Sequence, residues 1–135
     1  MAHSDVCNLP VTISAGESMS EPLKIDNLFI IAIDMPAEWT AADITFQAGD
    51  ANGNYRDINI VHHQITEFPP GGPELQTIDQ ELTISVDASR HRALSEKETI
   101  ALCGLVYLKL RSGTSDTPVA QAADRALSIV TRTAI

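Results

Sequence analysis

Residues 108–132 read LKLRSGTSDTPVAQAADRALSIVTR and decide the fold class, because they contain two strand-like runs around a polar loop. In the second run Leu127, Ile129 and Thr131 alternate with Ser128 and Val130, which places successive side chains on opposite faces of a strand. The loop is rich in Gly, Ser, Thr, Pro and Asp, which are turn residues. The stretch therefore predicts two β-strands joined by a long polar loop.

Strand patterns also dominate the rest of the chain. Five further segments have the alternation or the β-branched composition of strands, namely 11–14, 23–35, 43–49, 55–61 and 82–86. The apolar run LFIIAI at 28–33 suits a strand buried on both faces. Asn52 and Gly53 tolerate the positive φ angles of a tight reversal, so they predict a hairpin. About seven strands at short intervals predict an all-β fold, an antiparallel β-sandwich of the jelly-roll kind.

One or two short helices complete the expected fold. Ser95 and Glu98 have the spacing of a capping box, and Gly104 is placed to end the helix that begins there. A single helical turn is expected over residues 37–43, AEWTAAD. Residues 66–77, TEFPPGGPELQT, are rich in proline and glycine and predict a connection outside any sheet interior.

The chain of 135 residues fits one domain, which we place at 11–135 behind a flexible or partner-contacting arm at 1–10. The longest apolar run is too short to span a membrane. The amino terminus, MAHSDVCNLP, lacks the basic and then apolar pattern of a secretory signal. We expect folding in a cytoplasm, with Cys7 and Cys103 as reduced thiols; a disulfide between them is the less favoured alternative.

Charge constrains the class of partner. Nine basic and eighteen acidic residues give a formal net charge of −9. Such a surface repels phosphate backbones, so we expect no direct binding to nucleic acid. It serves solubility, and it also complements a basic protein partner. Aromatic residues make up only 4% of the chain, which weakens any interpretation that needs exposed stacking faces.

The motifs of catalysis and of metal binding do not fit this chain. The run from Asp50 imitates a calcium loop, but Tyr55 stands where glycine is required and Val61 where glutamate is required. His62 and His63 point to opposite faces of a strand and cannot share one ion. No Gly-x-Ser-x-Gly elbow is present. We therefore expect no enzyme, no catalytic residue, no metal and no cofactor.

Two segments carry a resemblance to a known class of proteins. YLKLRSGTSDTPVAQAADRALSIVTR combines an Arg-Ser-Gly-Thr turn, Pro-Val-x-Gln and an Asp-Arg pair before the last strand. The middle segment, MPAEWTAADITFQAGDANGNYRDI, has a Met-Pro, a Trp, a Thr-Phe-Gln strand and a glycine-containing tip. Together, over residues 20–60 and 105–132, they resemble small structural proteins of tailed bacteriophages.

The resemblance implies a capsid decoration, or cement, protein on the outer surface of the virion head, made in the host cytoplasm. Such proteins are β-rich, commonly trimeric, and bridge neighbouring subunits of the major capsid protein. The partners implied are therefore the major capsid protein and further copies of this chain. Similar sequences also serve in head spikes, head fibres and tails.

Seven residues are candidates for an interface or for an internal staple of the loop. Four have polar side chains suited to either role, and three belong to the expected amino-terminal arm: Arg111, Gln121, Asp124, Arg125, Val6, Leu9 and Pro10. A second hypothesis is a carbohydrate- or receptor-binding module of a head spike, head fibre or tail. That hypothesis needs exposed aromatic rings, and Trp39, Tyr55 and Tyr107 are its candidates.

Overall fold

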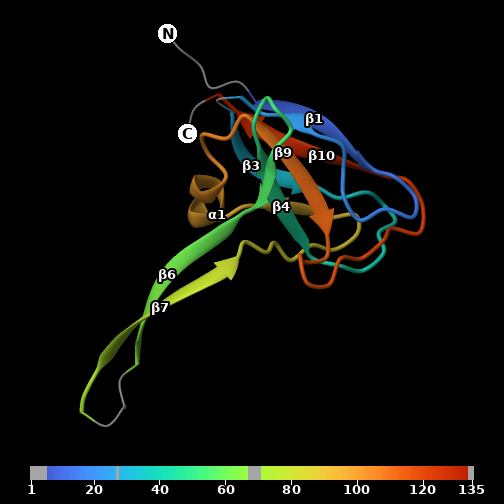
Figure 1. The fold of residues 1–135 in the computed structure, drawn as a ribbon. Coiled ribbons are helices and arrows are strands. Elements are labelled where there is room, and N and C mark those ends of the chain that lie inside the picture. The colour runs from blue at the N-terminus through green and yellow to red at the C-terminus, as the bar shows by residue number, and fades with distance from the viewer. Residues whose placement is uncertain (1–5, 27, 67–70, 134–135) are drawn as a thin grey trace.

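A computed structural model describes residues 6–26, 28–66 and 71–133 as an antiparallel β-sandwich from which a two-stranded hairpin projects (Figure 1). Its elements, in chain order, are β1 (Val6–Ile13), β2 (Leu23–Lys24), β3 (Phe29–Asp34), β4 (Ile44–Gly49), β5 (Tyr55–Asp57), β6 (Asn59–Thr66), β7 (Glu74–Glu81), β8 (His91–Ala93), α1 (Glu96–Ala101), β9 (Tyr107–Ser112) and β10 (Arg125–Arg132).

The sandwich consists of two four-stranded sheets, with strand orders β1-β10-β3-β8 and β2-β9-β4-β5. All strand pairs in both sheets are antiparallel. From β1 to β4 the chain passes from one sheet to the other at each step, and it does so again from β8 to β10. Eight strands wound in this way form a jelly roll. The predicted fold class is confirmed.

Isoleucine and leucine side chains from the inner faces of both sheets build the core, with Phe46 as its largest member. On β9, Leu108 and Leu110 are fully buried, whereas Tyr107 and Lys109 are only partly buried. The period of two explains this difference, since it turns alternate residues inward and outward. Each fully buried Leu or Ile stabilises the fold by roughly 1.5–3 kcal/mol.

Two local predictions are confirmed. The side chain of Ser95 accepts a hydrogen bond from the backbone N–H of Glu98, and the Glu98 carboxylate accepts one from the backbone N–H of Ser95. Gly104, with φ of 76°, follows the end of this helix.

The second confirmed prediction is the hairpin between β4 and β5, in which Gly53 has φ of 81°. The backbone N–H groups of Asn54 and Asn52 donate to the Asp50 carboxylate at the start of this turn, and they lower the pKa of the Asp50 carboxyl.

The expected helical turn at 37–43 is wrong, because this segment is a loop without helical hydrogen bonding. The indole Nε1 of Trp39 donates to the Ala42 carbonyl at 3.0 Å, and Thr40 is held by a side chain of a distant loop. These contacts give the backbone partners that a helix would otherwise supply. No helix in the described ranges has the length and apolarity needed to cross a membrane.

The region between β5 and β8 differs most from expectation. The strand expected at 55–61 is divided at Ile58, and the strand expected at 82–86 is reduced to one bridge between Ile44 and Ile84. The connection expected at 66–77 is also wrong for its second half, because β7 begins at Glu74; residues 67–70 lie outside the described residues. Pairing with β6 supplies the hydrogen bonds that turn this segment into a strand.

The boundary of the amino-terminal arm needs correction. Residues 6–10 belong to β1, which pairs with β10 from Val6 opposite Arg132 to Ile13 opposite Arg125. Within the described chain they are therefore part of the sandwich, and residues 1–5 lie outside the described residues. Pro10 is tolerated because β1 is an edge strand.

Candidate functional site

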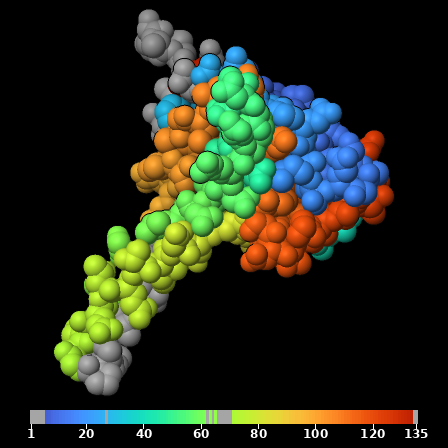
Figure 2. Space-filling view, in the orientation of Figure 1, coloured from blue at the N-terminus to red at the C-terminus, as the bar shows by residue number. Residues whose placement is uncertain are grey.

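The most distinctive feature of the molecule is the hairpin β6–β7, here called the arm, which is inserted between β5 and β8 (Figure 1). Its register runs from Asn59 opposite Glu81 at the root to Thr66 opposite Glu74 near the tip. Eight residues of strand span about 26 Å. Figure 2 shows the arm extending away from the body of the sandwich into solvent.

The arm exposes apolar side chains. Val61, Ile65 and Leu75 are 58%, 64% and 68% exposed, and Ile65 lies directly opposite Leu75 in the register. Because residues two apart in a strand share a face, and so do directly opposed residues, these three side chains lie on one face of the arm. This exposed apolar face makes the arm the candidate interaction surface of the described chain.

The apolar surface continues from the arm towards helix α1. A hollow of about 420 Å³ is lined by Asn59, Ile60, Val61, Lys97, Ile100 and Ala101. Ile100 is 54% exposed at this hollow. The root of the arm and the helix therefore form one partly apolar surface that contains a single lysine.

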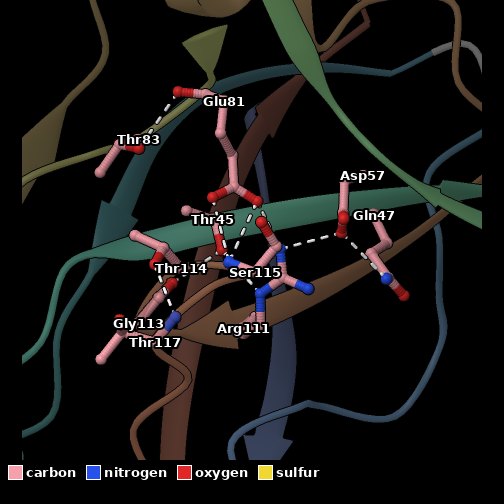
Figure 3. Close-up of polar contacts among 10 residues, drawn as sticks. All are labelled: Thr45, Gln47, Asp57, Glu81, Thr83, Arg111, Gly113, Thr114, Ser115 and Thr117. Carbon is pink, nitrogen blue, oxygen red and sulfur yellow. Dashed lines mark hydrogen bonds and ion pairs between the residues drawn. The ribbon is translucent and has the colours of Figure 1, made fainter.

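An ion-pair network holds the root of the arm (Figure 3). Arg111, on β9, is only 5% exposed, and its Nη2 lies 2.9 Å from Asp57 Oδ1 and 2.6 Å from Glu81 Oε2. Its Nε donates to Thr45 Oγ1 at 3.0 Å. Asp57 ends β5 and Glu81 ends β7, so Arg111 holds the two chain segments that lead into and out of the arm.

Two carboxylates and one guanidinium share this site. Gln47 Nε2 donates a hydrogen bond to Asp57 Oδ1 at 3.0 Å, and this bond, together with Arg111, holds the pKa of the Asp57 carboxyl below its ordinary value of 3.8. Glu81 also accepts the backbone N–H of Ser115, at 3.1 Å from Oε1. The root network thus reaches the polar loop that follows β9.

Gly113 shapes that loop. It has φ of 88°, and a Cβ on it would lie 2.4 Å from the Thr117 carbonyl oxygen. Thr45 Oγ1 donates to the Gly113 carbonyl at 2.7 Å, while Arg111 donates to the same hydroxyl oxygen. The Ser-Gly-Thr turn therefore packs closely against the backbone of residues 117–119. Through Thr45 it also supports Arg111 at the root of the arm.

A second polar network closes the loop before β10. Gln121 is 1% exposed; its Oε1 accepts the backbone N–H of Thr40 at 2.9 Å and Nε of Arg125 at 3.2 Å. Its Nε2 donates to the Thr40 carbonyl at 3.1 Å. Asp124 Oδ1 accepts the backbone N–H of Ala15 at 2.8 Å. These bonds tie the loop to two segments that are far away in the sequence.

The seven candidate residues fall into three places. Arg111 belongs to the root network, and Gln121, Asp124 and Arg125 belong to the second network, so these four side chains make hydrogen bonds within the chain. Val6, Leu9 and Pro10 lie on the edge strand β1, where Val6 is 60% exposed and Leu9 packs against the core.

Sequence reasoning missed Asp57 and Glu81, which share Arg111, and it missed the arm itself. Nothing local in the sequence marks either carboxylate as a partner of an arginine 30 or more residues away. The signal for the first strand of the arm in the sequence is the β-branched composition of residues 59–66, NIVHHQIT.

The aromatic candidates are partly covered. Trp39 packs against the core. The ring of Tyr55 lies over Gly49, and Nζ of Lys109 sits 4.3 Å from its centroid. Burial raises the pKa of the Tyr55 hydroxyl. These contacts occupy ring surface that a sugar would stack on. Both thiols, Cys7 and Cys103, are free.

The fold resembles that of one solved structure, the crystal structure of SPBc2 prophage-derived protein YomS. The TM-score is 0.52 over 98% of this chain and 96% of that chain, with 12% sequence identity. No protein-family model matches the sequence, and none of the curated proteins matches it. At this level of identity the likeness shows a shared fold.

Proposed function

We propose that this chain is a non-enzymatic structural protein of a tailed-bacteriophage particle, and that it decorates the outer surface of the head as a cement protein. The prophage origin of YomS, whose fold this chain shares along almost its whole length, supports a phage protein. The resemblance of residues 20–60 and 105–132 to small phage structural proteins supports the finer assignment.

The observation that carries the proposal is the projecting arm with its exposed apolar face. A sandwich of this kind has enough core to fold alone, so exposed Val61, Ile65 and Leu75 serve contacts with another protein. The arm extends beyond the body and is held at its root by Arg111. This is the geometry of a subunit that links neighbours.

The edge strand β1 supplies a second contact in this proposal. Val6, Leu9 and Pro10 lie along it, at the border of the first sheet. The arm, which links neighbouring copies, and the edge strand, which contacts the head, give each copy two modest interfaces. Several copies bound to one head sum such interfaces into strong retention, which opposes expansion of the shell under internal DNA pressure.

Charge selects the partner. The net charge of −9 favours a basic surface on the major capsid protein, because complementary potentials speed association and suppress wrong partners. Binding of this kind weakens as salt rises, since exposed charges are screened beyond about 10 Å at 0.1 M ionic strength.

The test is co-sedimentation of the purified chain with mature heads that lack it, followed by heating. Stoichiometric binding that raises the temperature of DNA release supports the proposal. Val6→Asp should weaken retention, whereas Val106→Asp, which changes another exposed valine outside β1, should not. Binding to tails alone, or to neither part of the particle, would overturn the head assignment.

A further inference from the structure

We infer that the arm of one copy docks on the outer face of the sheet β2-β9-β4-β5 of a second copy, so that the chain assembles with itself through its arms. The purpose that we give to this assembly rests on the proposed function. The existence of the assembly does not. It concerns the purified chain, with no phage head present.

The arm lacks cover within its own chain. β6 and β7 pair with each other and, among the described strands, with no other. A two-stranded hairpin alone is marginally stable in water, and this one leaves Val61, Ile65 and Leu75 more than half exposed. A neighbour that covers this face would remove apolar surface from water and stabilise the arm.

The charge of the arm defines what fits it. The sequence contains no lysine or arginine from residue 58 to residue 89, whereas Glu74 and Asp79 are exposed carboxylates on the arm. Asp79 lies directly opposite Val61 and therefore on the apolar face. The complementary surface must combine apolar or aromatic area with cations.

The outer face of the second sheet has this composition. Lys24 lies opposite Tyr107 in the register, and Lys109 follows two residues later on the same face. Tyr55 completes the set, with Lys109 Nζ at 4.3 Å from its ring centroid. Neither lysine makes an ion pair with any residue that the structure describes. Two tyrosines and two lysines that form no ion pair among the described residues therefore lie on one face of this sheet.

A neighbouring cation on this face is already neutralised. Arg111 projects from the same face of β9 but is buried between Asp57 and Glu81 at the root of the arm. The positive charge left for a partner is therefore that of Lys24 and Lys109. The complementarity lies on two surfaces of one chain, and this favours a second copy over an unrelated protein as the occupant.

The occupant is another copy's arm, since the arm extends away from its own body (Figure 2). The contact joins two different surfaces, which makes it heterologous. Heterologous contacts close into rings when the rotation between neighbours permits. A ring would also raise the number of head contacts that each assembly presents.

The first part of the test measures the mass of the purified chain by light scattering across a range of concentrations. We expect a defined oligomer. Val61→Ser with Leu75→Ser should raise the dissociation constant about 10-fold or more. Val6→Ser is the matched control, because this valine is 60% exposed and Val61 is 58% exposed, and it should leave the mass unchanged. Lys24→Glu with Lys109→Glu should weaken assembly as the arm variants do.

The second part maps the contact. Leu75 is replaced by the photoreactive p-benzoylphenylalanine, and equal amounts of ¹⁵N-labelled and unlabelled chains are mixed before irradiation. Mixed-isotope cross-links to peptides that contain Lys24 or Tyr107–Lys109 are expected. A monomer at all concentrations overturns the inference, and so do cross-links from arm to arm. A monomer that still binds heads leaves the proposed function intact, and an arm-linked oligomer that binds no heads leaves the inference intact.

Discussion

Nη2 of Arg111 lies 2.6 Å from Oε2 of Glu81, so a buried ion pair joins the middle of the sandwich to the last residue of the arm. The Arg111 side chain is 7% exposed and that of Glu81 15%. In such surroundings a charge is tolerated only while it is paired and hydrogen-bonded. The ion pair between Arg111 and Glu81 therefore fixes the direction of the arm at its root, although most of the arm is surrounded by solvent.

Loss of Arg111 should loosen the arm and destabilise the fold. Arg111→Met leaves Glu81 and Asp57 without their cation, and we expect a loss of about 3 kcal/mol in the free energy of unfolding. Urea unfolding measures the loss, and hydrogen exchange of the β6 and β7 amides measures the loosening. Arg56→Met, which changes an exposed arginine on β5, is the control and should be nearly neutral. Equal effects of the two variants would contradict this account of the root.

Acid should weaken the root through Asp57. Its folded-state pKa is lowered below 3.8 by the hydrogen bond from Gln47 and by Arg111, so its stabilising contribution is fully present above pH 3.8. The contribution is lost as the pH falls through the folded-state pKa. The difference in unfolding midpoint between the wild type and Asp57→Asn should persist from pH 7 to pH 5 and shrink below pH 3.8. A constant difference down to pH 2 would show that the carboxylate charge is unimportant.

Gly113 should tolerate a side chain far less well than Gly53. Both residues have positive φ, 88° and 81°, so alanine strains the backbone at either site by roughly 1–2 kcal/mol. Only at Gly113 would the new Cβ meet backbone atoms, with the Thr117 oxygen at 2.4 Å. Gly113→Ala should therefore cost about 2 kcal/mol more than Gly53→Ala in urea unfolding. Similar costs would mean that the loop can shift without loss.

Gln121 should act as a structural staple. Gln121→Leu removes the acceptor of the part-buried Thr40 N–H and of Arg125 Nε, and loss of a partner by such donors costs about 1–2 kcal/mol. Thermal or urea unfolding measures the change. Gln80→Leu, at an exposed position on the arm, is the control for the same substitution. An equally small effect at both positions would place Gln121 outside the stabilising network.

A chain without the distal arm should fold but not assemble. Ile60 and Gln80 are paired in the register, so an Asn-Gly turn in place of residues 61–79 can close the hairpin at its root. Because the sandwich core is untouched, the free energy of unfolding should change by less than about 1 kcal/mol. Light scattering should give the monomer mass. Persistent assembly of this variant would transfer the interface to another surface.

Local signals were enough for the fold class. The alternation in 126–132, the Asn52-Gly53 reversal and the capping box at Ser95 each involve residues close together in the sequence, and the structure contains all three. Apolar periodicity predicts which face of a strand is buried, and this prediction does not depend on what that face packs against. The β-sandwich could therefore be predicted before any contact was known.

The position of the arm and the contacts that hold it follow from tertiary packing. A proline- and glycine-rich segment indicates a turn, but whether its flanks pair as β6 and β7 depends on a register that spans more than twenty residues. Arg111 meets Asp57 and Glu81 only because the jelly roll brings β5, β7 and β9 together. The pattern of burial could be predicted from the sequence, because it depends on the alternation of neighbouring residues. The partners of charged groups follow from non-local packing, which no short stretch of sequence contains.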